Sequence, residues 1–178
     1  MIIKMINDIY EYMLNDGAVS LYLIGYLGPV ICILISIYWL WGFPKYLIVY
    51  VIFAMFDLFI NKVLKRWFKQ DRPLDIKSII GEEHEGIELY GMPSKHLQSI
   101  FFSITYLYLV KGSLQWLMGE LVIAALAINQ EITYRQHTIS QIIVGALCGI
   151  SVAYVANYVG EYWIYEKKKW QFIGLETR

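Results

Sequence analysis

Residues 46–65 read YLIVYVIFAMFDLFINKVLK, and they indicate the kind of fold to expect from this chain. An apolar helix of about 20 residues crosses the hydrocarbon core of a bilayer, and this stretch is long enough to do so. Asp57, Asn61 and Lys65 interrupt it at steps of four, which places them on one face of a helix. Polar groups are costly against lipid, so this face is predicted to point into a helical bundle.

The composition of the whole chain agrees with a membrane protein. Of its 178 residues 58% are hydrophobic, and the mean hydropathy of +0.48 is too high for an ordinary soluble domain. The formal net charge is zero, so there is no general basic field for nucleic acid, and the expected partners are membrane lipids. Cys32 and Cys148 both lie in apolar runs and are interpreted as small hydrophobic residues, and no pair of metal ligands stands out.

The remaining apolar runs predict a single all-α domain over residues 1–178, a polytopic membrane bundle of about five spans. The expected spans are 18–41, 46–64, a helical hairpin of 97–110 and 114–128, and 138–163. Gly145, Gly149 and Ala153 recur at intervals of four in the last span, a pattern typical of close helix packing in membranes. Residues 1–16 predict an amphipathic helix, either interfacial or packed on the bundle, and residues 164–178 a polar tail.

Polar residues gather in three clusters at the edges of these spans. The clusters are Lys65 with Arg72-Pro73, Pro93-Ser94-Lys95-His96, and His137 with Gln141. Five crossings place all three at one aqueous edge, with residues 66–93 as the long loop between the first two. Lys45, Lys111 and residues 167–169 fall on the other side, which the positive-inside rule assigns to the cytoplasm. We therefore expect a multi-pass protein of the endoplasmic reticulum or plasma membrane, with the clusters luminal or extracytoplasmic.

The residue types in the clusters suit a phosphate site. Lys65, Arg72 and Ser94 offer an ammonium, a guanidinium and a hydroxyl, and a helix beginning near Ser94 would add backbone N–H donors. Two histidines can divide the remaining work, because one can attack phosphorus while the other protonates the leaving oxygen. Gln141 lies one turn beyond His137, where its amide oxygen would accept a hydrogen bond from the far imidazole N–H and fix the tautomer. This scheme needs no metal and no cofactor. Taken singly, the same residues are also explained as interface anchors and structural histidines.

The three clusters together resemble the three motifs of the type 2 phosphatidic acid phosphatase superfamily. The resemblance covers residues 61–149, and the stretches YGMPSKHLQ at 90–98 and HTISQ at 137–141 are most similar to the dolichyldiphosphatases. It implies that His137 is the nucleophile that forms a phosphohistidine, His96 the general acid and Gln141 the orienting partner. It also implies phosphate ligands at Lys65, Arg72 and Ser94, and hydrolysis of a polyprenyl diphosphate to the monophosphate.

The chain departs from the family pattern at two positions. Glu131 stands where the family has an arginine six residues before the histidine, and its carboxylate would repel phosphate. Arg135, four residues further on, would replace the missing guanidinium if this segment is helical, or would pair with Glu131 as a surface ion pair. Lys95 stands where the family has a small residue, and it either adds a phosphate donor or crowds the site.

Three functions are compatible with these features. The first is a metal-independent membrane phosphatase that acts on a polyprenyl diphosphate or on another lipid phosphate, such as phosphatidate. The second is a non-catalytic relative that binds lipid phosphate, which Glu131 and Lys95 favour. The third is a channel or transporter lined by Asp57, Asn61 and Glu120, since inward polar residues also line membrane pathways.

Overall fold

The computed structural model describes residues 17–74 and 86–173, with side chains placed over 21–74 and 86–164. The described chain is helical and contains no strand, which confirms the predicted all-α class. Its elements are α2 (Gly17–Tyr26), α3 (Gly28–Leu40), α4 (Pro44–Phe68), the short 3-10 helix η1 (Gly86–Leu89), α5 (Lys95–Lys111), α6 (Leu114–Thr133) and α7 (Ile139–Ile173). The amphipathic helix predicted at 1–16 and the middle of the predicted loop lie outside the described residues.

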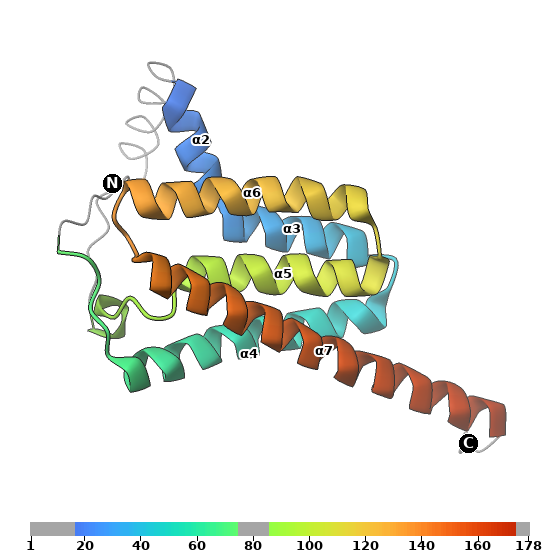
Figure 1. The fold of residues 1–178 in the computed structure, drawn as a ribbon. Coiled ribbons are helices and arrows are strands. Elements are labelled where there is room, and N and C mark those ends of the chain that lie inside the picture. The colour runs from blue at the N-terminus through green and yellow to red at the C-terminus, as the bar shows by residue number, and fades with distance from the viewer. Residues whose placement is uncertain (1–16, 75–85, 174–178) are drawn as a thin grey trace, which may run out of the picture.

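Helix α5 is the centre of the bundle, because α3, α4, α6 and α7 all contact it (Figure 1). Its buried side chains come from both sides of the helix and include Leu97, Ile100 and Phe102. The turn to α6 begins at Gly112, whose φ of 64° is a conformation that glycine adopts without strain. The predicted hairpin of two helices is therefore confirmed.

Helix α4 follows the prediction made from residues 46–65. Pro44 opens it at a position where a missing N–H costs nothing, and Lys69 ends it in a left-handed conformation. Asp57, Asn61 and Lys65 are all buried, so the polar face points into the bundle as predicted. The opposite face is apolar and open, and Met55, for example, is 70% exposed.

Helix α7 packs closely against α5 through its small residues. A Cβ added at Gly145 would lie 2.6 Å from the backbone oxygen of Ser94, and one added at Gly149 would collide with that of Gln98. Ala153, one turn further on, is fully buried. The predicted stripe of small residues therefore forms the α5–α7 contact. The backbone of α7 continues as a helix to Ile173, into the segment predicted to be a polar tail.

The prediction of one continuous helix over residues 18–41 is wrong. The chain turns at Leu27 and forms two helices, α2 and α3, that point in different directions (Figure 1). Pro29 lies in the first turn of α3 and has no N–H to continue the hydrogen bonds of α2. The bend lets α2 lie against α6, where a Cβ on Gly25 would be 2.5 Å from the backbone oxygen of Leu126. Helix α3 alone is about 20 Å long, shorter than the hydrocarbon core.

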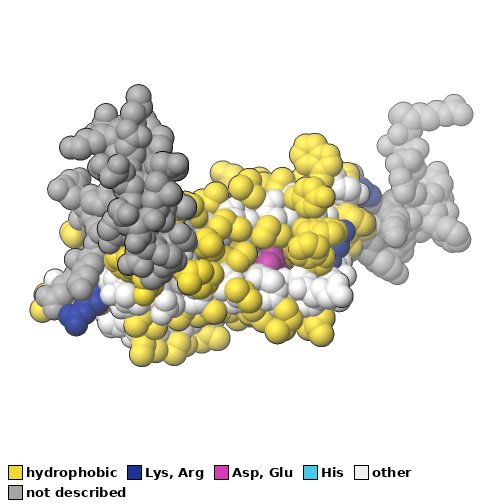
Figure 2. All heavy atoms as spheres, turned by 90° about the horizontal axis from the view of Figure 1, so that it is seen from above, with side chains coloured by type: hydrophobic (Ala, Val, Ile, Leu, Met, Phe, Trp, Pro, Cys, Tyr) yellow, Lys and Arg dark blue, Asp and Glu magenta, His cyan; other side chains and the backbone are white. Residues whose placement is uncertain are grey.

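Two helices have the length and hydropathy to cross a membrane. They are Pro44–Phe68 and the first part of α7, Ile139–Ile164, which contain 18-residue stretches with mean hydropathies of 2.1 and 2.0. Figure 2 shows hydrophobic side chains over most of one face of the described bundle and Lys or Arg near both ends. These features support membrane association. The five crossings remain a prediction, because among the described helices only these two meet both requirements.

Candidate active site

The three polar clusters meet at one end of the bundle. This end is formed by the last turn of α4, the first turn of α5, the last turn of α6 and the segment before α7 (Figure 1, left). Lys45 and Lys111 lie at the other end, near the start of α4 and the end of α5. The expectation that all three clusters share one edge is therefore confirmed in the geometry.

The polar face of α4 fixes the segment that leads into α5. Asn61 Nδ2 donates to Gln98 Oε1 at 2.9 Å and to the backbone oxygen of Pro93 at 3.3 Å. Gln98 Nε2 donates to Asp57, at 2.8 Å to its backbone oxygen and at 2.9 Å to Oδ1. These bonds are buried and hold two helices in register. Asp57 and Asn61 thus have a structural explanation, which weakens the channel interpretation based on them.

Ser94 caps α5, as predicted. Its Oγ accepts a hydrogen bond from the backbone N–H of Leu97 at 3.3 Å, and α5 begins at the next residue. The Ser94 backbone N–H donates to the backbone oxygen of Gln141 at 3.1 Å, which ties the start of α5 to α7. Lys95 and His96 therefore lie in the first helical turn, where the dipole of α5 favours an anion.

The hydrogen bonds around His137 determine which of its ring nitrogens carries the proton. Arg72 Nη1 lies 3.0 Å from Nε2, and a guanidinium can only donate, so Nε2 is the nitrogen with the lone pair. The proton is then on Nδ1, which donates to Gln141 Oε1 at 3.2 Å. Burial, the largest cause, together with the charges of Arg72 and Lys65, holds the pKa of His137 well below its usual value. The imidazole is therefore neutral, and Nε2 can act as a nucleophile.

Gln141 is itself fixed by its surroundings. Its Oε1 also accepts from the backbone N–H of Thr138 at 3.1 Å, and its Nε2 donates to the backbone oxygen of Asp71 at 2.9 Å. Gly91 packs directly on the amide, because an added Cβ would lie 2.5 Å from Oε1. The loop and α7 together hold this side chain in one orientation, which in turn orients the imidazole of His137.

Glu88 joins three of the predicted cations of the site, a contact that the sequence did not predict. Lys65 Nζ is fully buried and lies 2.7 Å from Glu88 Oε2, while Lys95 Nζ is 3.6 Å from Oε1. Arg72 Nε donates to the Glu88 backbone oxygen at 2.9 Å. Burial opposes ionisation of Glu88, but the hydrogen bond from Lys65 and the positive charges outweigh it and hold its pKa below the usual value. The Glu88 carboxylate therefore contacts the same cations that were predicted to bind phosphate.

Glu131 is part of the site and not a surface residue. Only 2% exposed, it accepts a hydrogen bond from Ser94 Oγ at 3.0 Å. Its two oxygens lie 3.6 Å from His96 Nδ1 and 3.6 Å from His137 Nε2. Burial raises its pKa to about 7, and the bond from Ser94 opposes this only in part. The carboxyl group that replaces the family arginine thus lies between the two histidines.

Arg135 does not take the place that helical spacing predicted. Helix α6 ends at Thr133, and Arg135 adopts a φ of 52° in the turn that follows, so it is not one helical turn from Glu131. Its side chain is exposed, whereas Glu131 is buried, and the guanidinium beside His137 belongs to Arg72. The surface ion pair with Glu131 is wrong for the same reason.

The described residues contain no group of three or more His, Cys, Asp and Glu side chains that could hold a metal ion. The contacts described above build the site from cations, two histidines, the N-terminus of α5 and two carboxyl groups.

This combination, at one end of an apolar helical bundle, has the chemistry to bind a phosphate-bearing ligand. The chain belongs to the PAP2 superfamily, whose family model matches residues 45–165. That range contains every predicted site residue. Members of the superfamily are phosphatases, and many act on lipids, so a hydrolase associated with membranes is supported. Neither a curated protein nor a solved structure matches the chain.

Proposed function

We propose that the protein is a multi-pass lipid phosphatase that hydrolyses a polyprenyl diphosphate to the monophosphate through a phosphohistidine at His137. One observation carries the proposal. Arg72 and Gln141 leave the lone pair on His137 Nε2, the ring nitrogen that lies among the cations and beside Glu131. A buried neutral imidazole with this tautomer is a nucleophile placed beside phosphate ligands.

In the first step, His137 Nε2 attacks the terminal phosphorus of the diphosphate. The bond from that phosphorus to the bridging oxygen breaks, and protonated His96 gives its proton to the departing monophosphate. Arg72 turns from Nε2 to the phosphoryl oxygens, whose charge Lys65 also stabilises. The Nδ1–H of the phosphorylated imidazole remains hydrogen-bonded to Gln141.

In the second step, water attacks the phosphohistidine. His96 has lost its proton and now takes one from the water, and the bond between phosphorus and Nε2 breaks. Inorganic phosphate is released, and the lone pair returns to His137. His96 suits both steps because its side chain is 27% exposed, between the buried nucleophile and the outside.

The diphosphate would bind at the aqueous edge, with the isoprenoid tail along the exposed apolar face of α4. The edge that carries Lys45, Lys111 and residues 167–169 would be cytoplasmic, which places the active site on the luminal or extracytoplasmic side. Phosphatidate or another lipid phosphate fits the same head-group chemistry.

Glu131 favours a second candidate, a non-catalytic relative that binds lipid phosphate. An ionised carboxylate at 3.6 Å from His137 Nε2 opposes the approach of a phosphate. In the catalytic proposal, Glu131 must therefore be protonated when substrate binds, and its raised pKa supports this.

The deciding experiment measures phosphate release by the purified protein in dodecyl maltoside with a chelator present. The substrates are farnesyl diphosphate, a long polyprenyl diphosphate and phosphatidate. We expect release from the polyprenyl diphosphates, a loss of several orders of magnitude in His137→Ala, and a loss of ~10²-fold to 10³-fold in Arg72→Ala, as for one transition-state donor. If wild type and His137→Ala release no phosphate from any substrate, the enzyme proposal fails. Binding of the same lipids to both proteins would then support the non-catalytic relative.

A further inference from the structure

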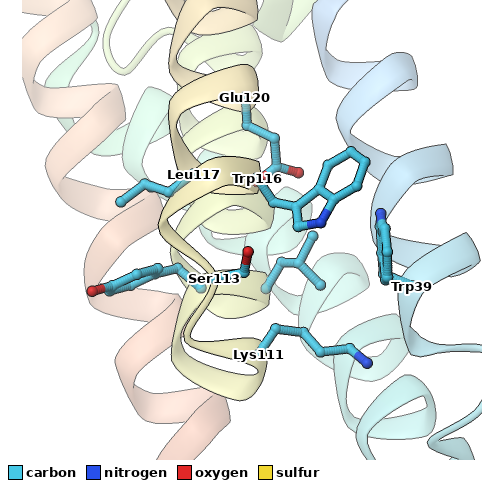
Figure 3. Close-up of a pocket in the computed structure, with 8 residues that line it drawn as sticks. Trp39, Lys111, Ser113, Trp116, Leu117 and Glu120 are labelled. Carbon is cyan, nitrogen blue, oxygen red and sulfur yellow. The ribbon is translucent and has the colours of Figure 1, made fainter.

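A pocket lies between α3, α5 and α6, towards the end of the bundle opposite the candidate active site. Its volume is about 240 Å³, and its walls include Trp39, Tyr108, Lys111, Ser113, Trp116 and Glu120 (Figure 3). Glu120 and Glu131 are eleven residues apart on α6, which corresponds to ~16 Å along the helix. The pocket is therefore separate from the site that contains His137.

Glu120 is a buried carboxyl group without a hydrogen bond to one of its oxygens. The residue is 2% exposed, and Oε1 has no partner among the described residues. Figure 3 shows its carboxyl end directed into the pocket beside Trp116, and the pocket is lined by it. A buried acceptor that lacks a donor is costly, so a ligand with N–H groups would complete it.

Two indole rings line the space next to Glu120. The ring centroids of Trp39 and Trp116 are 4.5 Å apart, and the rings are tilted by 53°. The faces of indole rings attract cations, so an ammonium group beside Glu120 would gain from the carboxylate and from the rings together.

Lys111 supplies a positive charge at the other end of the pocket. Its Nζ lies 3.8 Å from the centre of the Phe43 ring and 5.7 Å from that of Trp39. Figure 3 shows Lys111 and Glu120 well separated, with Ser113 between them, and the ion pairs of the described residues do not join the two. The pocket thus presents a carboxyl group at its buried end and a cation and a hydroxyl at its outer end.

We propose that this pocket binds a phosphoethanolamine group, with the ammonium on Glu120 beside the indole rings and the phosphate on Lys111 and Ser113. A zwitterion matches both ends of the pocket, since its ammonium can pair with the Glu120 carboxylate and its phosphate with Lys111, whereas a simple anion or a simple cation matches only one end. A primary ammonium has three N–H donors for Glu120, and a quaternary choline group has none. The group can come from a lipid or from free phosphoethanolamine, and both share this chemistry.

The test titrates the full-length protein in dodecyl maltoside by calorimetry. The probes are dihexanoyl phosphatidylethanolamine, the matching phosphatidylcholine and phosphatidylglycerol, and soluble phosphoethanolamine. Glu120→Gln removes the charge and keeps the shape, and Glu161→Gln is the matched control on an exposed part of α7. We expect the ethanolamine lipid to bind more tightly than the other two, and Glu120→Gln to weaken it about tenfold to a hundredfold, as for a hydrogen bond to a charged group. Glu161→Gln should bind like wild type.

The outcomes separate the sources of the ligand and the ways in which the proposal fails. Binding of soluble phosphoethanolamine identifies the head group alone as sufficient, while binding of the lipid only shows that the acyl chains are needed. Equal affinity of Glu120→Gln and wild type, equal affinity for phosphatidylglycerol, or no binding of either ethanolamine probe would overturn the proposal. If Glu120→Gln does not fold, Lys111→Gln takes its place, and it should weaken the ethanolamine lipid while its phosphatase rate stays that of wild type.

Discussion

Replacing Glu131 with glutamine is the sharpest test of how the candidate active site works. The carboxyl oxygen of Glu131 is 3.6 Å from His137 Nε2, so the phosphoryl group that Nε2 attacks would come within ~4 Å of it. Two unit charges at that distance repel each other by about 4 kcal/mol at an effective dielectric constant of 20, which is ~10³-fold in binding or rate. Only protein with protonated Glu131 would then turn over.

The pKa of Glu131 turns this repulsion into a pH dependence. With the pKa raised to about 7, roughly nine-tenths of the protein is protonated there at pH 6 and one-tenth at pH 8. The titration of Glu131 by itself should lower kcat/KM of wild type about tenfold from pH 6 to pH 8. The glutamine variant carries no charge at this position at either pH, so the ratio of its kcat/KM to that of wild type should rise from about one at pH 6 to about ten at pH 8.

The assay measures initial rates of phosphate release from a polyprenyl diphosphate with chelator, at both pH values and for both proteins. Because the substrate and the buffer are the same, their own titrations cancel in the ratio. Glu161→Gln is a matched change on the exposed side of α7, and its kcat/KM should stay equal to that of wild type at both pH values. A glutamine variant that is equally slow at pH 6 and pH 8 would refute the reasoning, since Glu131 would then be needed as a carboxylate.

Three further results are expected. Gly91→Ala should lower kcat by ~10²-fold, because the new Cβ displaces the amide of Gln141, while Gly119→Ala, where nothing lies within 4 Å, should leave the rate unchanged in the same assay. Gly149→Ala should lower the free energy of unfolding by about 1–3 kcal/mol in a denaturant titration, since the Cβ meets the α5 backbone; stability equal to that of Gly119→Ala would contradict this. Because its pKa is higher in the folded protein, protonated Glu131 stabilises the fold fully below pH 4.5, and this stabilisation is lost as pH rises through about 7. The free energy of unfolding of Glu131→Gln, measured by thermal unfolding, should therefore change with pH by about 3 kcal/mol less than that of wild type. Equal pH profiles of the two proteins would contradict this.

Local rules in the sequence predicted much of what positions the site. The spacing of Asp57, Asn61 and Lys65 predicted a buried face, because the period of a helix is fixed by its backbone. Ser94 predicted a helix start, since its hydroxyl can serve the orphan N–H groups of the first turn. The spacing of Gly145 and Gly149 predicted close packing, which depends only on the small size of these residues.

Long-range contacts and one local signal were missed. Glu88 reaches Lys65 only because the loop returns across 23 positions of sequence, and no periodicity carries that information. Arg135 was predicted to lie one helical turn from Glu131, either as a replacement guanidinium or as its ion-pair partner, because spacing cannot tell where a helix ends. The break between α2 and α3 did have a signal, since Pro29 is visible in the sequence and lacks the N–H that a continuous helix requires.

The ion pair between Lys65 and Glu88 has a consequence for turnover. A fully buried ammonium without a partner is costly, and Glu88 keeps Lys65 charged before any ligand arrives. In the proposed reaction, a diphosphate would therefore displace the Glu88 carboxylate from Lys65 and would not bind an ammonium that has no partner. When the free phosphate forms, the Glu88 carboxylate competes with it for Lys65. The ion pair would therefore reduce inhibition by the product.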